Sequence, residues 1–345
     1  MTPSAEYPGG TGRPRILVLR ALGLGDLLTA VPALRALRRG RPAHELVLAA
    51  PARLAAAAAA TGLVDRLLPA AAPGRAVPAA LAWAGPAPDL AVDLHGSGPE
   101  SRRPLARLCP RRLYAYAQPD APEWRDDEHE RDRWCRLLER YGLPADPADL
   151  AVPAPAVASP APGAVVLHPG ADAAARCWPA ERFAAVARAL SRAGHRVVVT
   201  AGAAEGRLAS SVAGRAELAQ DAVIGGTGGD VPFDVLMALV AGARCVVAGD
   251  TGIAHLATAL GTPSVTLFGP VAPRLWGPPP RPYHRVLWHP DADDAPRPGD
   301  AHGDRPDERL LRITVEEVLD AVRALPPTGT AAGARPAQAA VPSAG

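Results

Sequence analysis

The stretch VVAGDTGIAHLATALGTPSVTLFGP at residues 246–270 combines an apolar strand, a sharp turn, an Ala/Leu-rich helix and a second β-branched strand. Asp250, Thr251 and Gly252 therefore lie where a parallel strand ends and the next helix begins. Open α/β sheets bind ligands at such junctions, because backbone N–H groups and the positive helix end converge there. Asp250 alone would be explained as the N-cap of this helix. That explanation does not cover the two glycines of the turn together with His255, one helical turn further on, so the stretch predicts a ligand site.

The same alternation of strands and helices runs through both halves of the chain. In the first half, strands are expected at 15–20, 45–50, 63–68 and 89–94, with a helix from about 26 to 39. In the second half, strands are expected near 164–168, 196–200 and 222–225, and helices at 180–193, 204–213, 232–241 and 314–324. This alternation predicts the α/β class, with two doubly wound, Rossmann-like domains that face a central cleft.

The Pro/Ala-rich stretch at 143–163 indicates a weakly packed linker between the two halves. We expect the N-terminal domain at 15–150, a linker at 151–163 and the C-terminal domain at 164–325. Polar tails at 1–14 and 326–345 are expected to be disordered. The last helix is expected to cross back to the N-terminal domain.

The composition is that of a globular protein, with 345 residues, 48% hydrophobic residues and a net charge of +2. This charge does not favour a nucleic-acid partner. The chain contains no lysine, so any contact with a phosphate must come from arginine, backbone amides or helix ends. The cysteines at 109, 135, 177 and 245 show neither metal-ligand spacing nor a disulfide framework. Without a signal-peptide pattern or a membrane-length apolar run, we expect a cytoplasmic protein.

The segment ALGLGDLLTAVPALRAL at 21–37 places a glycine loop directly after the first strand. Gly23 and Gly25 allow a tight turn, and Asp26 begins the following helix. This is not a dinucleotide fingerprint, because the third glycine position is Leu28 and the second strand ends without an acidic residue. Asp26 is either an N-cap or first-turn acid that stabilises the helix dipole, or a carboxylate directed into the cleft, and the segment alone favours the first interpretation.

Two further charged residues follow strand-end turns in the second half. Arg176 precedes the helix that Trp178-Pro179 opens, where a cation would meet the phosphates of an anionic ligand. Its alternative role is that of a solvated loop arginine. Glu205 follows a glycine turn and opens a helix, which is ordinary for a first-turn acid. Beside the turn at Asp250, however, it is placed to accept hydrogen bonds from ribose hydroxyls.

Taken in order, the segments GLGDLLTAVPAL, HPGADAAARCWPAERFA, VVVTAGAAE and GDTGIAHLATALGTPSVTLFGP resemble glycosyltransferase family 9, the heptosyltransferase-like enzymes. The resemblance covers about residues 15–290 and implies the GT-B fold, with the acceptor in the N-terminal domain and the sugar nucleotide in the C-terminal one. By position it implies a catalytic aspartate at Asp26, a diphosphate contact at Arg176, a ribose contact at Glu205, and a D-T-G-x-x-H nucleotide-sugar motif at Asp250, Thr251, Gly252 and His255. Where the family usually has lysine, Arg176 keeps the charge.

The resemblance implies an inverting, metal-independent glycosyltransferase that moves a heptose or similar sugar from a nucleotide diphosphate sugar, such as an ADP-sugar, to a hydroxyl of a cell-envelope acceptor. Lipopolysaccharide core is the best-known acceptor of the family. No cofactor or metal is expected besides the donor, and no nucleic acid. The expected partners are the donor and a glycan or glycolipid acceptor, with room for peripheral contact at the inner membrane surface. Two alternatives stay open, a sugar-nucleotide epimerase of GT-B-like fold and a non-catalytic sugar-nucleotide-binding protein.

Overall fold

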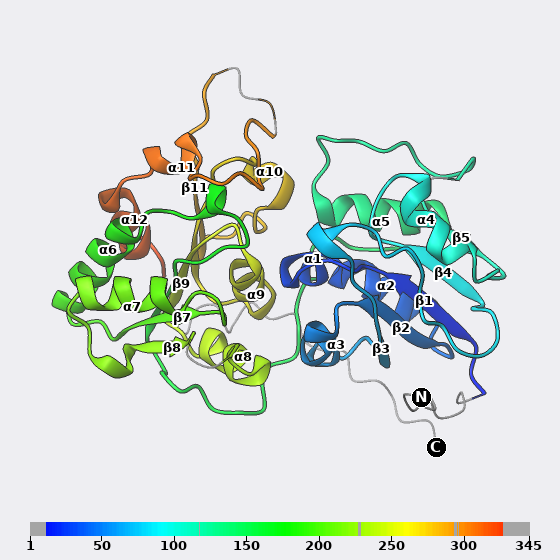
Figure 1. Cartoon of the computed structure of the whole chain (residues 1–345), viewed down its shortest axis with the longest axis horizontal. Coiled ribbons are helices and arrows are strands. Elements are labelled where there is room, and N and C mark those ends of the chain that lie inside the picture. The colour runs from blue at the N-terminus through cyan, green and yellow to red at the C-terminus, as the bar shows by residue number, and fades with distance from the viewer. Residues whose placement is uncertain (1–11, 117, 227–228, 293–294, 296, 327–345) are drawn as a thin grey trace.

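The computed structural model describes residues 12–116, 118–226, 229–292, 295 and 297–326. The tails expected at 1–14 and 326–345 lie almost entirely outside this range. The described chain forms two parallel sheets, and each is covered by helices on both faces (Figure 1). The predicted α/β class with two doubly wound units is therefore confirmed. Among the described helices, none is both long and apolar enough to cross a membrane.

The N-terminal sheet has the order β3-β2-β1-β4-β5 with all strands parallel. Its strands are β1 (Arg15–Leu19), β2 (Glu45–Ala50), β3 (Arg66–Pro69), β4 (Leu90–Asp93) and β5 (Leu113–Tyr114). Its helices are α1 (Leu24–Thr29), α2 (Val31–Gly40), α3 (Ala55–Ala60), α4 (Pro99–Ala106) and α5 (Glu130–Arg140), with 3₁₀ turns η1 (Ala52–Leu54) and η2 (Pro73–Arg75). Ile16 and Val18 pack on one face of the sheet and Leu17 and Leu19 on the other, as expected for a strand buried on both sides.

The helix expected from about 26 to 39 is divided in two. α1 begins at Leu24, and the chain changes helix at Ala30 before α2. Pro32 stands in the first turn of α2, where its missing N–H costs no hydrogen bond, but the same residue cannot continue α1. The short α1 therefore has its own direction and its own N-terminus.

The C-terminal sheet has the order β11-β10-β9-β6-β7-β8 and is also parallel. Its strands are β6 (Val165–His168), β7 (Val197–Ala201), β8 (Val223–Gly225), β9 (Cys245–Gly249), β10 (Ser264–Leu267) and β11 (His284–Leu287). Its helices are α6 (Ala180–Arg192), α7 (Gly206–Arg215), α8 (Phe233–Ala241), α9 (Gly252–Leu260), α10 (Pro273–Trp276), α11 (Glu308–Arg312) and α12 (Val315–Arg323), with 3₁₀ turns η3 (Ala174–Arg176) and η4 (Gln220–Ala222). The strand order reverses between β6 and β9 here, and between β1 and β4 in the first sheet. Such reversals open crevices at the carboxyl ends of strands.

The last helix does not cross back to the N-terminal domain, so that expectation was wrong. α12 packs on α6, β10 and β11 of the C-terminal unit (Figure 1). Its apolar side chains Val318 and Val322 are buried in the same core as α6. With this face covered, α12 has no apolar stripe left to hold it against the other domain.

The segment between α5 and β6 contains no helix or strand in the described structure. It is more closely packed than the Pro/Ala-rich composition predicts. Ala161 is buried in the core of the C-terminal unit, and the Val152 N–H donates to the carbonyl of Ala259 in α9 at 3.1 Å. The connection therefore runs along the surface of α9 and contributes to the contact between the two units.

The N-termini of α1 and α9 meet where the two units touch (Figure 1). A Cβ added at Gly25 of α1 would lie 2.7 Å from Cδ2 of His255 in α9. A Cβ added at Gly252 of α9 would lie 3.0 Å from Cβ of Leu24 in α1. Both glycines are therefore required by the close approach of the two helices. A second contact joins the units where Nε2 of His129 donates to the Gly277 carbonyl at 3.0 Å.

We predict that Gly25→Ala lowers the stability of the protein, although alanine normally favours a helix. The added methyl group must displace the His255 ring, and overpacking of this kind costs about 1–3 kcal/mol. Gly214→Ala is the matched control, because it also lies in a helix and a Cβ there meets nothing within 4 Å. It should raise stability by about 0.5–1 kcal/mol. Thermal unfolding of both variants checks this, and a stabilised Gly25→Ala would mean that the two helices do not approach as closely as described.

Candidate functional site

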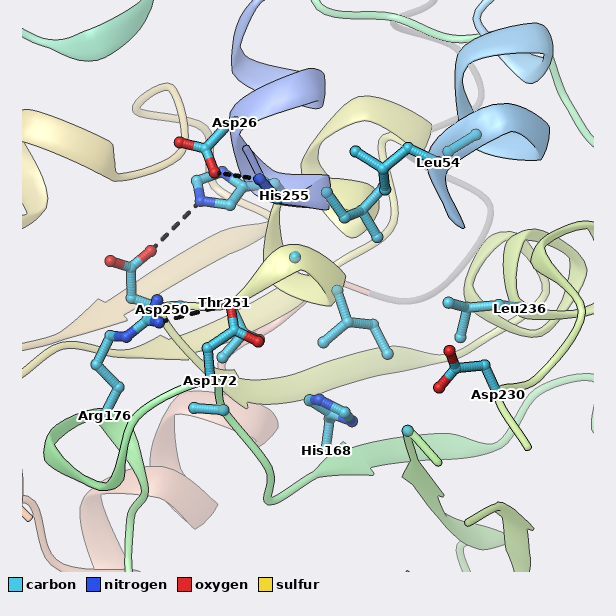
Figure 2. Close-up of a pocket in the computed structure, with 18 of the residues that line it drawn as sticks. Asp26, Leu54, His168, Asp172, Arg176, Asp230, Leu236, Asp250, Thr251 and His255 are labelled. Carbon is cyan, nitrogen blue, oxygen red and sulfur yellow. Dashed lines mark hydrogen bonds and ion pairs between the residues drawn. The ribbon is translucent and has the colours of Figure 1, made fainter. Parts of the chain in front are cut away.

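A cavity of about 670 Å³ lies between the two units (Figure 2). All the predicted site residues line it, namely Gly23, Gly25, Asp26, Arg176, Glu205, Asp250, Thr251, Gly252 and His255. They follow the carboxyl ends of β1, β6, β7 and β9, which are the positions at which the two sheets open their crevices. The expected site residues of both units therefore lie around one cavity, which is formed between the units.

Asp26 belongs to the N-terminal wall of the cavity. Its residue is only 5% exposed, and its Oδ2 accepts the N–H of Gly23 at 2.9 Å, closing the first turn of α1. The same oxygen forms an ion pair with Nη2 of Arg75. Gly23 is the N-cap of α1, so Asp26 is not the N-cap but a first-turn acid, and its residue also lines the cavity.

A buried arginine lies directly beneath Asp26. Nε of Arg20 donates to the Asp26 carbonyl at 2.7 Å, and its Nη2 is 3.7 Å from Asp26 Oδ1. The same Nη2 donates to Oε1 of Glu130 at 2.8 Å. Glu130 is in turn held by Arg133 and by the indole of Trp134. Sequence reasoning missed this support, because Arg20 and Glu130 are 110 residues apart in the chain.

The glycine loop is held from the neighbouring strand. Nδ1 of His95, just past β4, accepts the N–H of Ala21 at 3.1 Å. Burial, reinforced by the nearby Arg20, lowers the pKa of His95 to about 4, so the ring is neutral at pH 7 and its nitrogen can accept.

The opposite wall contains the N-terminus of α9. Thr251 is its N-cap and, within the described part of the chain, no side chain forms a capping hydrogen bond to the helix, so the alternative of Asp250 as the N-cap is wrong. The Asp250 side chain instead lies 3.4 Å from Nε2 of His255 through its Oδ1. The His255 ring is held against the edge of Trp276, with ring centroids 6.0 Å apart. The positive end of α9 therefore lines the cavity, and backbone N–H groups at such an end favour an anion.

Arg176 lies next to this helix end. Its Nη1 donates to the Asp250 carbonyl at 3.0 Å, while Nε and Nη2 are buried and have no hydrogen-bond partner among the described residues. A side chain that is 14% exposed is not the solvated loop arginine that was the alternative. Buried donors without acceptors cost about 1–3 kcal/mol. Nη2 lies 3.9 Å from Oδ2 of Asp172, beyond hydrogen-bond distance, so both donors of Arg176 are available to an anionic ligand in the cavity.

Glu205 lies further along the same wall. Its Oε2 accepts the Gly202 N–H at 2.8 Å and is 3.8 Å from Nε2 of His168. Burial lowers the pKa of His168, an effect that the carboxylate of Glu205 opposes. Nδ1 of His168 lies 3.1 Å from the Thr200 hydroxyl. Sequence analysis gave no role to His168, the last residue of the strand expected near 164–168.

The far end of the cavity combines apolar side chains with the carboxylate of Asp230, which lies beside Leu236 (Figure 2). Figure 2 shows Asp26, His255 and Asp250 at one end, and Leu54 and Leu236 at the other. The cavity therefore offers an anion site and hydrogen-bond acceptors beside an apolar recess. This combination suits a molecule with a flat apolar group, hydroxyls and phosphates.

Comparison with known proteins agrees with this arrangement. The family model "Glycosyltransferase family 9 (heptosyltransferase)" matches residues 121–295, just over half of the chain. Lipopolysaccharide heptosyltransferase 3 of Escherichia coli is 32% identical over 169 residues, 48% of this chain and 48% of that protein. Lipopolysaccharide heptosyltransferase 1 of Pseudomonas aeruginosa is 32% identical over 187 residues, 51% of this chain and 48% of that protein. The chain thus spans about half the length of the curated relatives it matches.

Two solved structures share the fold over most of the chain. ADP-heptose lipopolysaccharide heptosyltransferase II of Escherichia coli aligns with a TM-score of 0.68 at 20% identity, covering 90% of this chain and 98% of that one. A family 9 glycosyltransferase from Veillonella parvula aligns with a TM-score of 0.70 at 19% identity, covering 90% and 96%. These likenesses show the GT-B fold. Together with the family model, they show that the chain belongs to glycosyltransferase family 9.

Proposed function

We propose that this protein is an inverting glycosyltransferase that moves a sugar from a nucleotide diphosphate sugar to an acceptor hydroxyl, with Asp26 as general base. The observation that carries the proposal is the placement of two opposite functions on facing walls of one cavity. The C-terminal wall offers Arg176 and the uncapped end of α9 to an anion, and the N-terminal wall offers a carboxylate. A protein that only binds a sugar nucleotide has no need of the carboxylate on the N-terminal wall.

The donor is proposed to lie along the C-terminal wall. Its diphosphate would meet the N–H groups of Arg176 and the N-terminus of α9, its ribose would bind Glu205, and its base would lie on Leu236, with Leu54 of the N-terminal unit on the other side of the base. The names of the relatives favour an ADP-linked heptose or a similar pyranose, because solved neighbours are described as ADP-heptose enzymes. Asp250 and His255 would then contact the sugar or the phosphate attached to it.

The proposed chemistry is a single displacement. Asp26 takes the proton of the acceptor hydroxyl, the oxygen attacks the anomeric carbon, and the bond from that carbon to the diphosphate breaks. Because the base and the diphosphate site lie on opposite walls, attack from the far side inverts the anomeric configuration. Arg176 and the N-terminus of α9 would stabilise the charge of the leaving diphosphate, and we propose that these two groups serve in place of a metal ion.

The acceptor is proposed to be a hydroxyl of a cell-envelope glycan or glycolipid. The curated relatives are named for lipopolysaccharide, which places lipopolysaccharide core first among the acceptors to be tested. A protein that uses such a donor and acceptor would work in the cytoplasm, with peripheral contact at the inner membrane face.

We predict that Glu205→Gln weakens the binding of ADP by at least about tenfold, because a hydrogen bond to a charged group contributes about 1.5–3 kcal/mol. The amide oxygen can still accept the Gly202 N–H, so the turn should persist. Glu181→Gln is the matched control, since Glu181 is an exposed acid at the start of α6 and lies outside the cavity. Titration calorimetry measures both, and unchanged affinity in Glu205→Gln would remove the ribose role.

We predict that Asp26→Asn lowers turnover by at least about a hundredfold while the donor binds at least as tightly as in the wild type. The donor site lies on the other wall, and asparagine can still accept the Gly23 N–H. Asp149→Asn removes the same charge from an exposed ion pair with Arg39 and serves as the control.

Turnover is measured with ADP-sugars, with and without envelope acceptors, and melting temperatures confirm that the variants are folded. Full turnover in Asp26→Asn would leave Asp26 as a helix cap alone. An altered sugar nucleotide formed without acceptor would identify an epimerase instead.

A further inference from the structure

Arg75 has a backbone that no local requirement explains. It follows Pro73 and Gly74 in η2, and both Gly74 and Arg75 adopt left-handed conformations, with φ of 61° and 62°. Glycine does so freely, but a residue with a Cβ does so at a cost that other contacts must offset. The side chain of Arg75 makes those contacts.

The guanidinium of Arg75 reaches across the mouth of the cavity. Nη2 forms an ion pair with Oδ2 of Asp26, and Nη1 lies 3.5 Å from Oδ2 of Asp172. Asp172 belongs to the other unit, in the loop after β6, and its Oδ2 is also 3.9 Å from Nη2 of Arg176. Four side chains of alternating charge, Asp26, Arg75, Asp172 and Arg176, therefore cross from one wall to the other.

This arrangement engages both groups on which the proposed reaction depends. Oδ2 of Asp26 already accepts from Gly23 and from Arg75, so these donors compete with an acceptor hydroxyl for its lone pairs. Asp172 places a carboxylate beside Arg176, where the diphosphate of the donor would bind. An entering diphosphate repels Asp172 and attracts both arginines.

Arg75 and Asp172 are the two of these four side chains that would have to move, and they are also the more exposed ones. The side chains of Arg75 and Asp172 are 35% and 71% exposed, whereas those of Asp26 and Arg176 are 7% and 14% exposed. Ion pairs with exposed partners are weak and break readily. Arg75 and Asp172 can therefore change position while Asp26 and Arg176 stay in place.

We propose that Arg75 is a positioning residue that exchanges partners during the reaction. Without donor it pairs with Asp26 and Asp172. When the diphosphate displaces Asp172, Arg75 turns to the diphosphate and leaves Asp26 free to take the proton of the acceptor. This inference rests on the proposed function, because it requires an anionic donor and a basic Asp26.

The first test is a double-mutant cycle read as nucleotide affinity. Titration calorimetry is run with ADP, GDP and UDP, and the cycle uses whichever binds the wild type most tightly. Asp26→Asn releases Arg75 for the diphosphate, so it should tighten binding about two- to fivefold. Arg75→Gln should weaken binding, and adding Asp26→Asn to it should give no gain. In the Arg75→Lys background, Asp26→Asn should still tighten nucleotide binding, but by less than in the wild type.

Arg53→Gln is the matched control, because Arg53 also lines the cavity on the N-terminal side and has no ion pair among the described residues. The gain from Asp26→Asn should persist in this background. A gain that is as large in Arg75→Gln as in the wild type would show simple charge repulsion by Asp26 and would overturn the role of Arg75.

The second test is a pair of crystal structures of the wild type, with and without the bound nucleoside diphosphate. The ion pair between Arg75 and Asp26 should be present in the structure without nucleotide and broken in the complex, where the guanidinium should contact a phosphate oxygen. An Arg75 that still pairs with Asp26 in the complex overturns the proposal while the proposed function stands. A wild type that binds none of the three nucleotides contradicts the proposed function itself.

Discussion

The contact between the N-termini of α1 and α9 is the constraint on which the rest of this structure depends. Each helix follows a strand at the point where its sheet reverses order, so each opens a crevice at its N-terminal end. The glycines at positions 25 and 252 bring the two ends close enough for Leu24 and His255 to pack across the junction. One cavity thereby forms from two half-sites, and neither half carries all the groups that a transfer reaction requires.

The carboxylate of Asp26 contacts a different arginine on its buried side and on its cavity side. From below it is held by Arg20, which is fully buried and fixed in turn by Glu130, so this support cannot leave without exposing an uncompensated charge. From the cavity it is held by Arg75, which is half-exposed and joined to a surface carboxylate. The buried pair fixes the position of the carboxylate, and the exposed pair can yield to a stronger anion. Arg20 thus fixes where the Asp26 carboxylate lies, and Arg75 controls whether that carboxylate is available to an acceptor.

The sequence predicted what is local in this protein. Strand-end turns with glycine and an acid, as at Asp26 and Asp250, identify themselves by their order along the chain, and parallel strands bring such turns to one edge. The supports at Arg20, Glu130 and Arg75 could not be predicted in this way, because they meet only when distant segments pack. The predicted position of α12 was wrong because it was assumed from related folds. The apolar face of α12 packs instead in the core of the C-terminal unit.

A crystal structure with an intact, non-transferable ADP-sugar tests the central claim most directly, namely that donor and base occupy facing walls of one cavity. The account predicts a diphosphate on Arg176 and the N-terminus of α9, a ribose on Glu205, and the anomeric carbon turned toward Asp26 with the diphosphate on its far side. A nucleotide bound to the N-terminal wall would contradict it. So would a sugar whose anomeric carbon faces away from Asp26.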